Sequence, residues 1–177
     1  MKTAVKTDQK VRCNRQKVGN LEIFFREAGD PKKTAILLLH GFPTSSHMYR
    51  EVLRGLCDDF YLIAPDYPGF GDSSFPSPYE FQYTFDQLAA IMENFIEARR
   101  LDPFIVMIQD YGAPIGLRIA SKHPEWIKGL VIQNGNAYEE GLDKKGWGII
   151  FDYWKNKSPT LEKQIIANVF SLEGLRW

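Results

Sequence analysis

The sequence predicts an α/β protein in which a mostly parallel sheet carries helices on both faces. Short runs of consecutive apolar residues, typical of strands that are buried on both sides, recur along the chain. Longer segments between them repeat apolar residues at helical spacing. Strands and helices that alternate in this way favour right-handed crossovers onto a parallel sheet.

The elements follow in chain order. Residues 11–17 and 21–27 are expected to form a hairpin, because Gly19-Asn20 between them is a typical tight-turn dipeptide. Further strands are expected at residues 35–39, 60–64, 104–109 and 129–133, and helices at 46–56, 85–99 and 113–123. In the second helix the apolar residues recur at helical spacing, and Thr84 can cap its start.

Length and composition are those of an ordinary globular domain. The 177 residues suffice for one core, and 22 basic residues balance 22 acidic ones, which argues against nucleic acid or anionic lipid as a partner. No apolar stretch is long enough to cross a bilayer, and we expect a cytoplasmic protein. Cys13 and Cys57 lie far apart without metal-type spacing, so two reduced thiols, no metal and no cofactor are expected. Residues 1–16 are polar and are expected to form a flexible leader.

The most informative segment is the junction at Asp110. The apolar run 104–109 stops at this carboxylate, and Gly112 opens a segment with helical character. A sharp turn from strand to helix exposes the residue at its apex, and a glycine there permits close backbone approach. An aspartate at the apex favours nucleophilic attack on carbon, with an ester to the enzyme as intermediate. The alternative is a simple N-cap, in which Asp110 accepts hydrogen bonds from the first turn and Pro114 lies within that turn.

Two further turns support the catalytic interpretation. The strand at 35–39 runs into His40-Gly41-Phe42-Pro43, and the strand at 60–64 ends in a loop rich in glycine and proline at residues 65–73. With the elbow at Gln109-Asp110-Tyr111-Gly112, these sequences resemble the α/β-hydrolase superfamily. Within it, they are similar to the branch with an aspartate nucleophile, the epoxide hydrolases and haloalkane dehalogenases.

This resemblance implies an α/β-hydrolase fold and a set of site residues. Asp110 would be the nucleophile, and the backbone N–H groups of Phe42 and Tyr111 would form the oxyanion hole. Residues 17–134 would form the N-terminal part of the core, and residues 135–177 the start of a helical cap inserted after the sixth strand, in which the fold would be truncated. The resemblance implies a small apolar electrophile and water as the reaction partners.

The family places its catalytic His and, in many members, its orienting acid beyond the cap. None of His40, His47 and His123 occupies the position of that base, and Asn134 stands where some dehalogenases keep the acid. We therefore expect the chain to be the N-terminal part of a longer hydrolase that is inactive by itself.

The resemblance also separates two branches. Epoxide opening yields a basic alkoxide that needs a proton donor, and Tyr153, in a segment that resembles the cap segment of epoxide hydrolases, is the candidate. Dehalogenases usually carry Trp after the nucleophile, where this chain has Tyr111, although Trp147 or Trp154 could also bind a halide. Epoxides are the favoured substrates. A haloalkane dehalogenase-like hydrolase and a non-catalytic ligand-binding module stay as alternatives.

Overall fold

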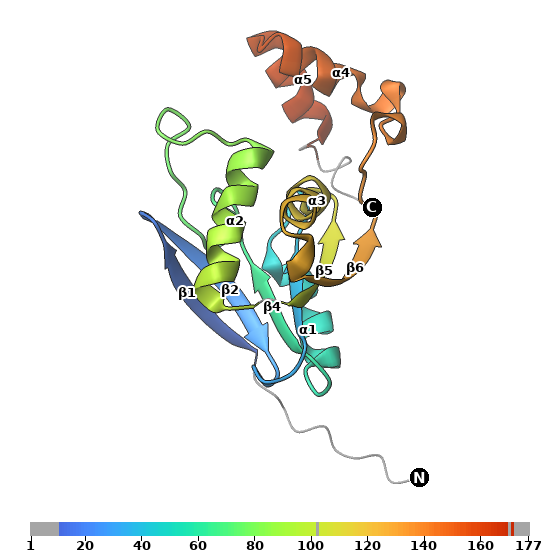
Figure 1. Cartoon of the computed structure of the whole chain (residues 1–177). Coiled ribbons are helices and arrows are strands. Elements are labelled where there is room, and N and C mark those ends of the chain that lie inside the picture. Colours follow the sequence, from blue (N-terminus) through green and yellow to red (C-terminus); the bar gives the residue numbers. More distant parts are fainter. Residues whose placement is uncertain (1–10, 102, 170, 172–177) are drawn as a thin grey trace. The chain divides into compact units, whose positions relative to one another are not determined.

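A computed structural model describes residues 11–101, 103–169 and 171. The chain divides into two units, residues 1–137 and 138–177. The first unit contains one six-stranded sheet with the strand order β1-β2-β4-β3-β5-β6 (Figure 1). The strands are β1 (Arg12–Val18), β2 (Leu21–Ala28), β3 (Ala35–Leu39), β4 (Tyr61–Pro65), β5 (Phe104–Gln109) and β6 (Ile127–Gln133).

Strand direction follows the expected fold class. β1 and β2 form the predicted hairpin, and β2 also pairs antiparallel with β4. The pairs β3–β4, β3–β5 and β5–β6 are parallel, so the chain must cross over between them. These parallel strands end at one edge of the sheet, and the residues that follow β3, β4 and β5 are therefore brought together there.

Helices cover both faces of the sheet. One face packs against α2 (Phe85–Arg99) and α3 (Gly112–Lys122), which lie side by side (Figure 1). The other face packs against a short 3-10 helix η1 (Ser46–Tyr49) and α1 (Arg50–Leu56). The expected single helix over 46–56 is thus divided, with the first turn in the tighter form and Ser45 accepting a bond from the His47 N–H at its start. A second 3-10 helix, η2 (Pro124–Trp126), precedes β6.

The helix α2 occupies the residues expected from the sequence. Thr84 caps it by accepting a hydrogen bond from the backbone N–H of Gln87 at 3.1 Å. It ends where Arg100 adopts a left-handed conformation with φ of 53°. Its core-facing side chains, from Leu88 to Ile96, are buried as the spacing predicts.

The leader predicted for residues 1–16 is wrong over residues 12–16, which belong to β1. Two of their side chains, those of Arg12 and Asn14, bond to Glu27 on β2. Its Oε1 accepts bonds from Arg12 at 3.2 Å and Asn14 at 3.0 Å, and its Oε2 accepts one from Arg99 at 3.0 Å. The polar strand β1 is therefore held by its pairing with β2 and by these two bonds to a buried carboxylate. Residues 1–10 of the predicted leader lie outside the described residues.

The second unit contains the 3-10 helix η3 (Glu139–Gly141) and the helices α4 (Lys144–Lys155) and α5 (Pro159–Val169). One side of α4 carries the rings of Trp147, Phe151 and Trp154, whose centroids lie 5.6–6.4 Å apart. The helical character expected for this region is confirmed, whereas its identity as a cap stays a prediction.

In the described part of the chain, no helix has both the length and the apolar character that crossing a membrane requires. Cys13 and Cys57 are both free.

Candidate active site

Asp110 lies at the apex of a sharp turn between β5 and α3. The strand ends at Gln109, Asp110 has a φ of 49°, and the helix begins at Gly112. The Asp110 carbonyl accepts the N–H of Ala113 at 2.9 Å, which closes the turn. A left-handed conformation costs a residue with a side chain about 1–3 kcal/mol and is concentrated at functional sites. The strain at this residue is therefore an observation that favours a functional role.

Glycines allow the elbow to pack tightly on the sheet. A Cβ at Gly112 would lie 2.2 Å from the carbonyl oxygen of Leu39, and one at Gly116 would lie 2.5 Å from Cγ2 of Ile108. Real side chains do not tolerate such distances. The helix α3 can therefore approach β3 and β5 only because both positions lack a side chain.

The two oxygens of the Asp110 carboxylate have different environments. Its Oδ1 accepts the backbone N–H of Phe42 at 2.7 Å and that of Tyr111 at 2.7 Å. Among the described residues, no group donates a hydrogen bond to Oδ2. The two amides thus hold one oxygen and leave the other available. The sequence predicted that the carboxylate lies within reach of these two amides, but not the difference between its two oxygens. The roles assigned to these three residues stay predictions.

The alternative in which Asp110 is a simple N-cap does not fit this geometry. The cap position of α3 is Tyr111, and no side chain bonds the first turn there. Asp110 instead accepts bonds from its immediate neighbour and from Phe42, on a loop that is far away in the sequence. Its carboxylate therefore connects two loops and does not serve only as the cap at the start of α3.

A buried carboxylate that was not predicted from the sequence bonds the start of η1, which follows the Phe42 loop. Asp66 follows β4 and has no exposed surface. Its Oδ1 accepts the N–H of Ser46 at 2.6 Å, and its Oδ2 accepts the N–H of Asp72 at 2.9 Å. A polar residue directly after a buried strand, at the edge that carries Asp110, was the signal that could have revealed it.

His40 has both ring nitrogens engaged with the backbone. Its Nδ1 lies 2.9 Å from the carbonyl oxygen of Gly41, and the Tyr67 N–H lies 3.5 Å from its Nε2. Since a carbonyl only accepts and an N–H only donates, the proton is on Nδ1 and the imidazole is neutral. Burial lowers the pKa of His40, which outweighs the nearby charges of Asp66 and Asp110 that raise it. His40 is therefore a structural residue of the turn.

The other two histidines also lie in places that suit structural roles. His47 is exposed in η1. His123 follows α3, where its ring stacks on Trp126 at 3.8 Å and lies 3.9 Å from a carboxylate oxygen of Glu93. Neither of them contacts Asp110 within the described part of the chain. The same part holds no cluster of three or more His, Cys, Asp or Glu that could bind a metal ion.

The buried imidazole makes stability depend on pH. Because the pKa of His40 is lower in the folded protein than its ordinary value of 6.5, the unfolded chain binds a proton first as the pH falls. We expect the free energy of unfolding to decrease below pH 6.5, by at most about 1.4 kcal/mol per pH unit from this residue. The free energy of unfolding, measured in urea at several pH values, should change less steeply with pH in His40→Asn than in the wild type. In the exposed variant His47→Asn it should change with pH as in the wild type. Equal slopes in both variants would contradict the neutral, buried state of His40.

Aromatic rings form an apolar wall beside Asp110. The ring of Tyr111 is stacked on Phe42 with centroids 5.2 Å apart, and it meets the edges of Phe70 at 6.2 Å and Phe85 at 5.0 Å. Burial, with a contribution from the Asp110 charge, raises the pKa of Tyr111. Its phenol is therefore protonated at neutral pH. A carboxylate next to such a wall suits an apolar substrate.

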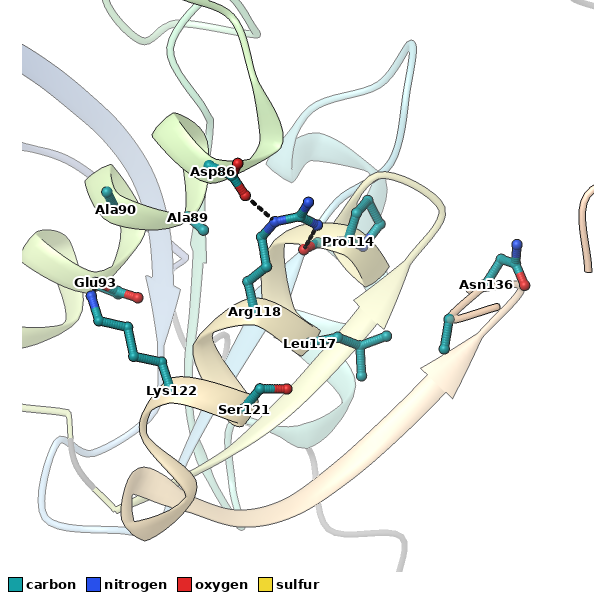
Figure 2. Close-up of a pocket in the computed structure, with 11 residues that line it drawn as sticks. Asp86, Ala89, Ala90, Glu93, Pro114, Leu117, Arg118, Ser121, Lys122 and Asn136 are labelled. Atoms are coloured by element: carbon teal, nitrogen blue, oxygen red, sulfur yellow. Dashed lines mark hydrogen bonds and ion pairs between the residues drawn. The ribbon is translucent and has the colours of Figure 1, made fainter. Parts of the chain in front are cut away.

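A groove lies elsewhere in the first unit. It has a volume of about 630 Å³ and runs along the outer side of α2 and α3 (Figure 2). Two ion pairs connect the helices along it, Asp86–Arg118 and Glu93–Lys122, each at 2.5 Å. None of the site residues predicted from the sequence lines this groove. Tyr153 lies on α4, in the second unit, so its contact with a substrate of Asp110 stays a prediction.

Comparison with known proteins gives the family. The family model described as the alpha/beta hydrolase fold matches residues 34–168. An uncharacterized hydrolase of Saccharomyces cerevisiae is 45% identical over 148 residues, which is 82% of this chain and 50% of the relative. Haloalkane dehalogenase 2 of Mycobacterium tuberculosis is 40% identical over 143 residues, 79% of this chain and 47% of the relative. The solved haloalkane dehalogenase DatA from Agrobacterium tumefaciens has a TM-score of 0.72 at 26% identity, covering 89% of this chain and 52% of that one.

The chain belongs to the α/β-hydrolase fold family, and its relatives place it in the branch of the haloalkane dehalogenases and epoxide hydrolases. The resemblance inferred from the three turn sequences is thereby confirmed. The chain spans about half the length of the curated relatives that it matches.

Proposed function

We propose that the protein is a hydrolase that forms a covalent ester between Asp110 and a carbon atom of a small apolar electrophile. The observation that carries this proposal is the asymmetry of the carboxylate. Oδ1 is held by two amides, whereas Oδ2 receives no hydrogen bond from the described residues and keeps its lone pairs for attack. A carboxylate with a structural role alone would gain from having both oxygens satisfied.

In the first step, Oδ2 attacks the electrophilic carbon, and the bond from that carbon to its leaving group breaks. Oδ1 becomes the carbonyl oxygen of the ester, still within reach of the Phe42 and Tyr111 amides. The aromatic wall presents an apolar surface to the substrate beside the carboxylate.

In the second step, a water molecule that loses a proton to a base attacks Cγ of the ester. Negative charge then develops on Oδ1, where the two N–H groups stabilise it, each by about 3 kcal/mol. Collapse of this intermediate releases the alcohol and restores the carboxylate. His40 is buried and neutral and both of its nitrogens are engaged, so it is not the base of this step.

The favoured substrate is an epoxide. Opening the ring leaves an alkoxide, which needs a proton, and a phenol is a suitable donor. Tyr153 on α4 is the proposed donor. Haloalkanes are the second candidate class, because relatives at 40% identity carry the name haloalkane dehalogenase. A halide needs no proton, so this alternative does not require Tyr153.

Product assays distinguish the two classes. If epoxides are the substrates, a form of the protein that includes the base of the second step should convert an aryl-substituted epoxide to its diol. In that form, Tyr153→Phe should slow this reaction by about 10²-fold or more, the range typical of a general acid. Release of bromide from a bromoalkane should then be weak and insensitive to Tyr153→Phe. Rapid bromide release without diol formation would instead assign the halide class. Unchanged diol formation in Tyr153→Phe would leave this residue a packing role only.

A further inference from the structure

Phe85 connects the candidate active site to the outer groove. It is the first residue of α2, and its ring is partly buried against the core. On one side the ring meets Tyr111 at 5.0 Å, with an angle of 78° between the ring planes. On the other side, the guanidinium carbon of Arg118 lies 5.9 Å from the centroid of Phe85. The same ring therefore contacts a residue of the elbow and a residue that lines the groove.

Arg118 is itself held in place by two contacts, both drawn in Figure 2. Its Nε lies 2.5 Å from Oδ1 of Asp86, and its Nη1 donates to the carbonyl oxygen of Pro114 at 2.9 Å. The side chains of Arg118 and Asp86 are 44% and 82% exposed, so their ion pair contributes little to stability. The role of the ion pair is to position the Arg118 guanidinium over the ring of Phe85.

We propose that Phe85 is a specificity-determining residue that limits the length of the apolar chain accepted beside Asp110, with Arg118 as the positioning residue that holds its ring. The inference rests on the proposed function and adds the shape of the substrate to it. With the ring in place, an alkyl chain that lies along Tyr111 ends at Phe85. Removing the ring would open space toward Arg118, which lines the groove of about 630 Å³.

The residues around the groove make this space suitable for an alkyl chain. Its walls include Ala89 and Ala90 from α2 and Leu117 from α3, all of them labelled in Figure 2. The charged side chains at its rim form the ion pairs Asp86–Arg118 and Glu93–Lys122. An apolar chain that enters the groove therefore does not have to desolvate an unpaired charge. Longer primary alkyl substrates are therefore the class that a smaller residue at position 85 would admit.

The test compares Phe85→Ala with the wild type over a series of 1-bromoalkanes from propyl to decyl. Mass spectrometry of the Asp110 peptide gives the rate of ester formation for each chain length. We expect the ratio of the decyl rate to the propyl rate to rise by about 10-fold or more in Phe85→Ala, because each methylene that finds room contributes to binding. Phe81→Ala is the matched control, since Phe81 packs against the same core and contacts Tyr83. Its ratio should not change.

A second pair of variants tests the positioning role. Arg118→Gln should raise the same ratio by a smaller factor, whereas Lys122→Gln, which removes the other ion pair between α2 and α3, should leave it unchanged. The ratio is informative because loss of stability alone would lower both rates together. An unchanged ratio in Phe85→Ala, or an equal rise in Phe81→Ala, would overturn the proposal.

The chain-length dependence can also be read without any reaction. Dissociation constants of primary alcohols of the same lengths, measured by calorimetry, should shift in favour of decanol in Phe85→Ala only. If neither the bromoalkanes nor terminal epoxides of the same chain lengths label Asp110 in the wild type but this shift occurs, the chemistry proposed for Asp110 is wrong and the role of Phe85 stands. If labelling occurs and neither the rates nor the alcohol affinities shift, the role of Phe85 is wrong.

Discussion

In a form of the protein that includes the base of the second step, replacing Asp110 by Asn is expected to abolish turnover while the fold is kept. The amide is almost isosteric with the carboxylate, and its oxygen can still accept the N–H groups of Phe42 and Tyr111. It lacks the nucleophilic oxygen that Oδ2 supplies, so no ester can form. Loss of a catalytic nucleophile typically costs on the order of 10⁴-fold or more in rate. Initial rates of product formation, with circular dichroism to compare the folds, measure the effect.

The control for Asp110→Asn is to exclude deamidation of the new side chain. Asn at this position can deamidate back to Asp, so the mass of the peptide that contains residue 110 must be measured in the same sample. Substantial activity in protein that is shown to carry Asn would contradict the nucleophilic role. A melting temperature far below that of the wild type would mean that Asp110 also holds the two loops together.

Replacing Gly112 by Ala should have the largest effect on stability. The new Cβ would lie 2.2 Å from the carbonyl oxygen of Leu39, which belongs to the central strand β3 and cannot move without breaking the sheet. Overpacking of a tight site typically costs about 1–3 kcal/mol, and a clash with backbone belongs at the upper end or beyond. We expect the free energy of unfolding, measured in urea, to fall by about 3 kcal/mol or more, and ester formation to be lost because the elbow shifts.

The chain contains a matched control for this substitution. Gly55 lies inside α1, and a Cβ there would meet no atom within 4 Å. Gly55→Ala should therefore stabilise the protein by up to about 1 kcal/mol, the ordinary gain for a glycine inside a helix. If both variants were destabilised by the same amount, the close packing of α3 on β3 would not be the reason that position 112 is glycine.

The parts of the fold that depend on local signals could be predicted from the sequence. The strand at Phe104–Gln109 was visible as an uninterrupted apolar run, and α2 was visible from its apolar spacing and the capping residue Thr84. The elbow at Asp110 was predictable for a similar reason, because a carboxylate ends a buried strand and Gly112 opens a helix. In each case the information lies within a few neighbouring residues.

The parts that depend on contacts between distant residues could not be predicted. The turn at Gly19-Asn20 predicts a hairpin that includes residues 12–16, but the polar composition of these residues also suits a leader. The contacts of Arg12 and Asn14 with Glu27 depend on the register of β1 and β2. Asp66 bonds the amides of Ser46 and Asp72 through turns that the sequence does not place. The difference between Oδ1 and Oδ2 of Asp110 depends on Phe42, which is 68 residues away. Such pairings are set by the topology of the sheet and have no local signature.

The central claim is that Oδ2 of Asp110 forms an ester with the substrate. Its most direct test is rapid acid quenching of the protein during reaction with an aryl-substituted epoxide and, separately, with 1-bromobutane, followed by mass spectrometry of the digested peptides. The account predicts that at least one of these reagents adds its carbon skeleton to Asp110, and that the adduct is missing in Asp110→Asn. Product formation by the wild type with no adduct on Asp110, or an adduct on a different carboxylate, would contradict it.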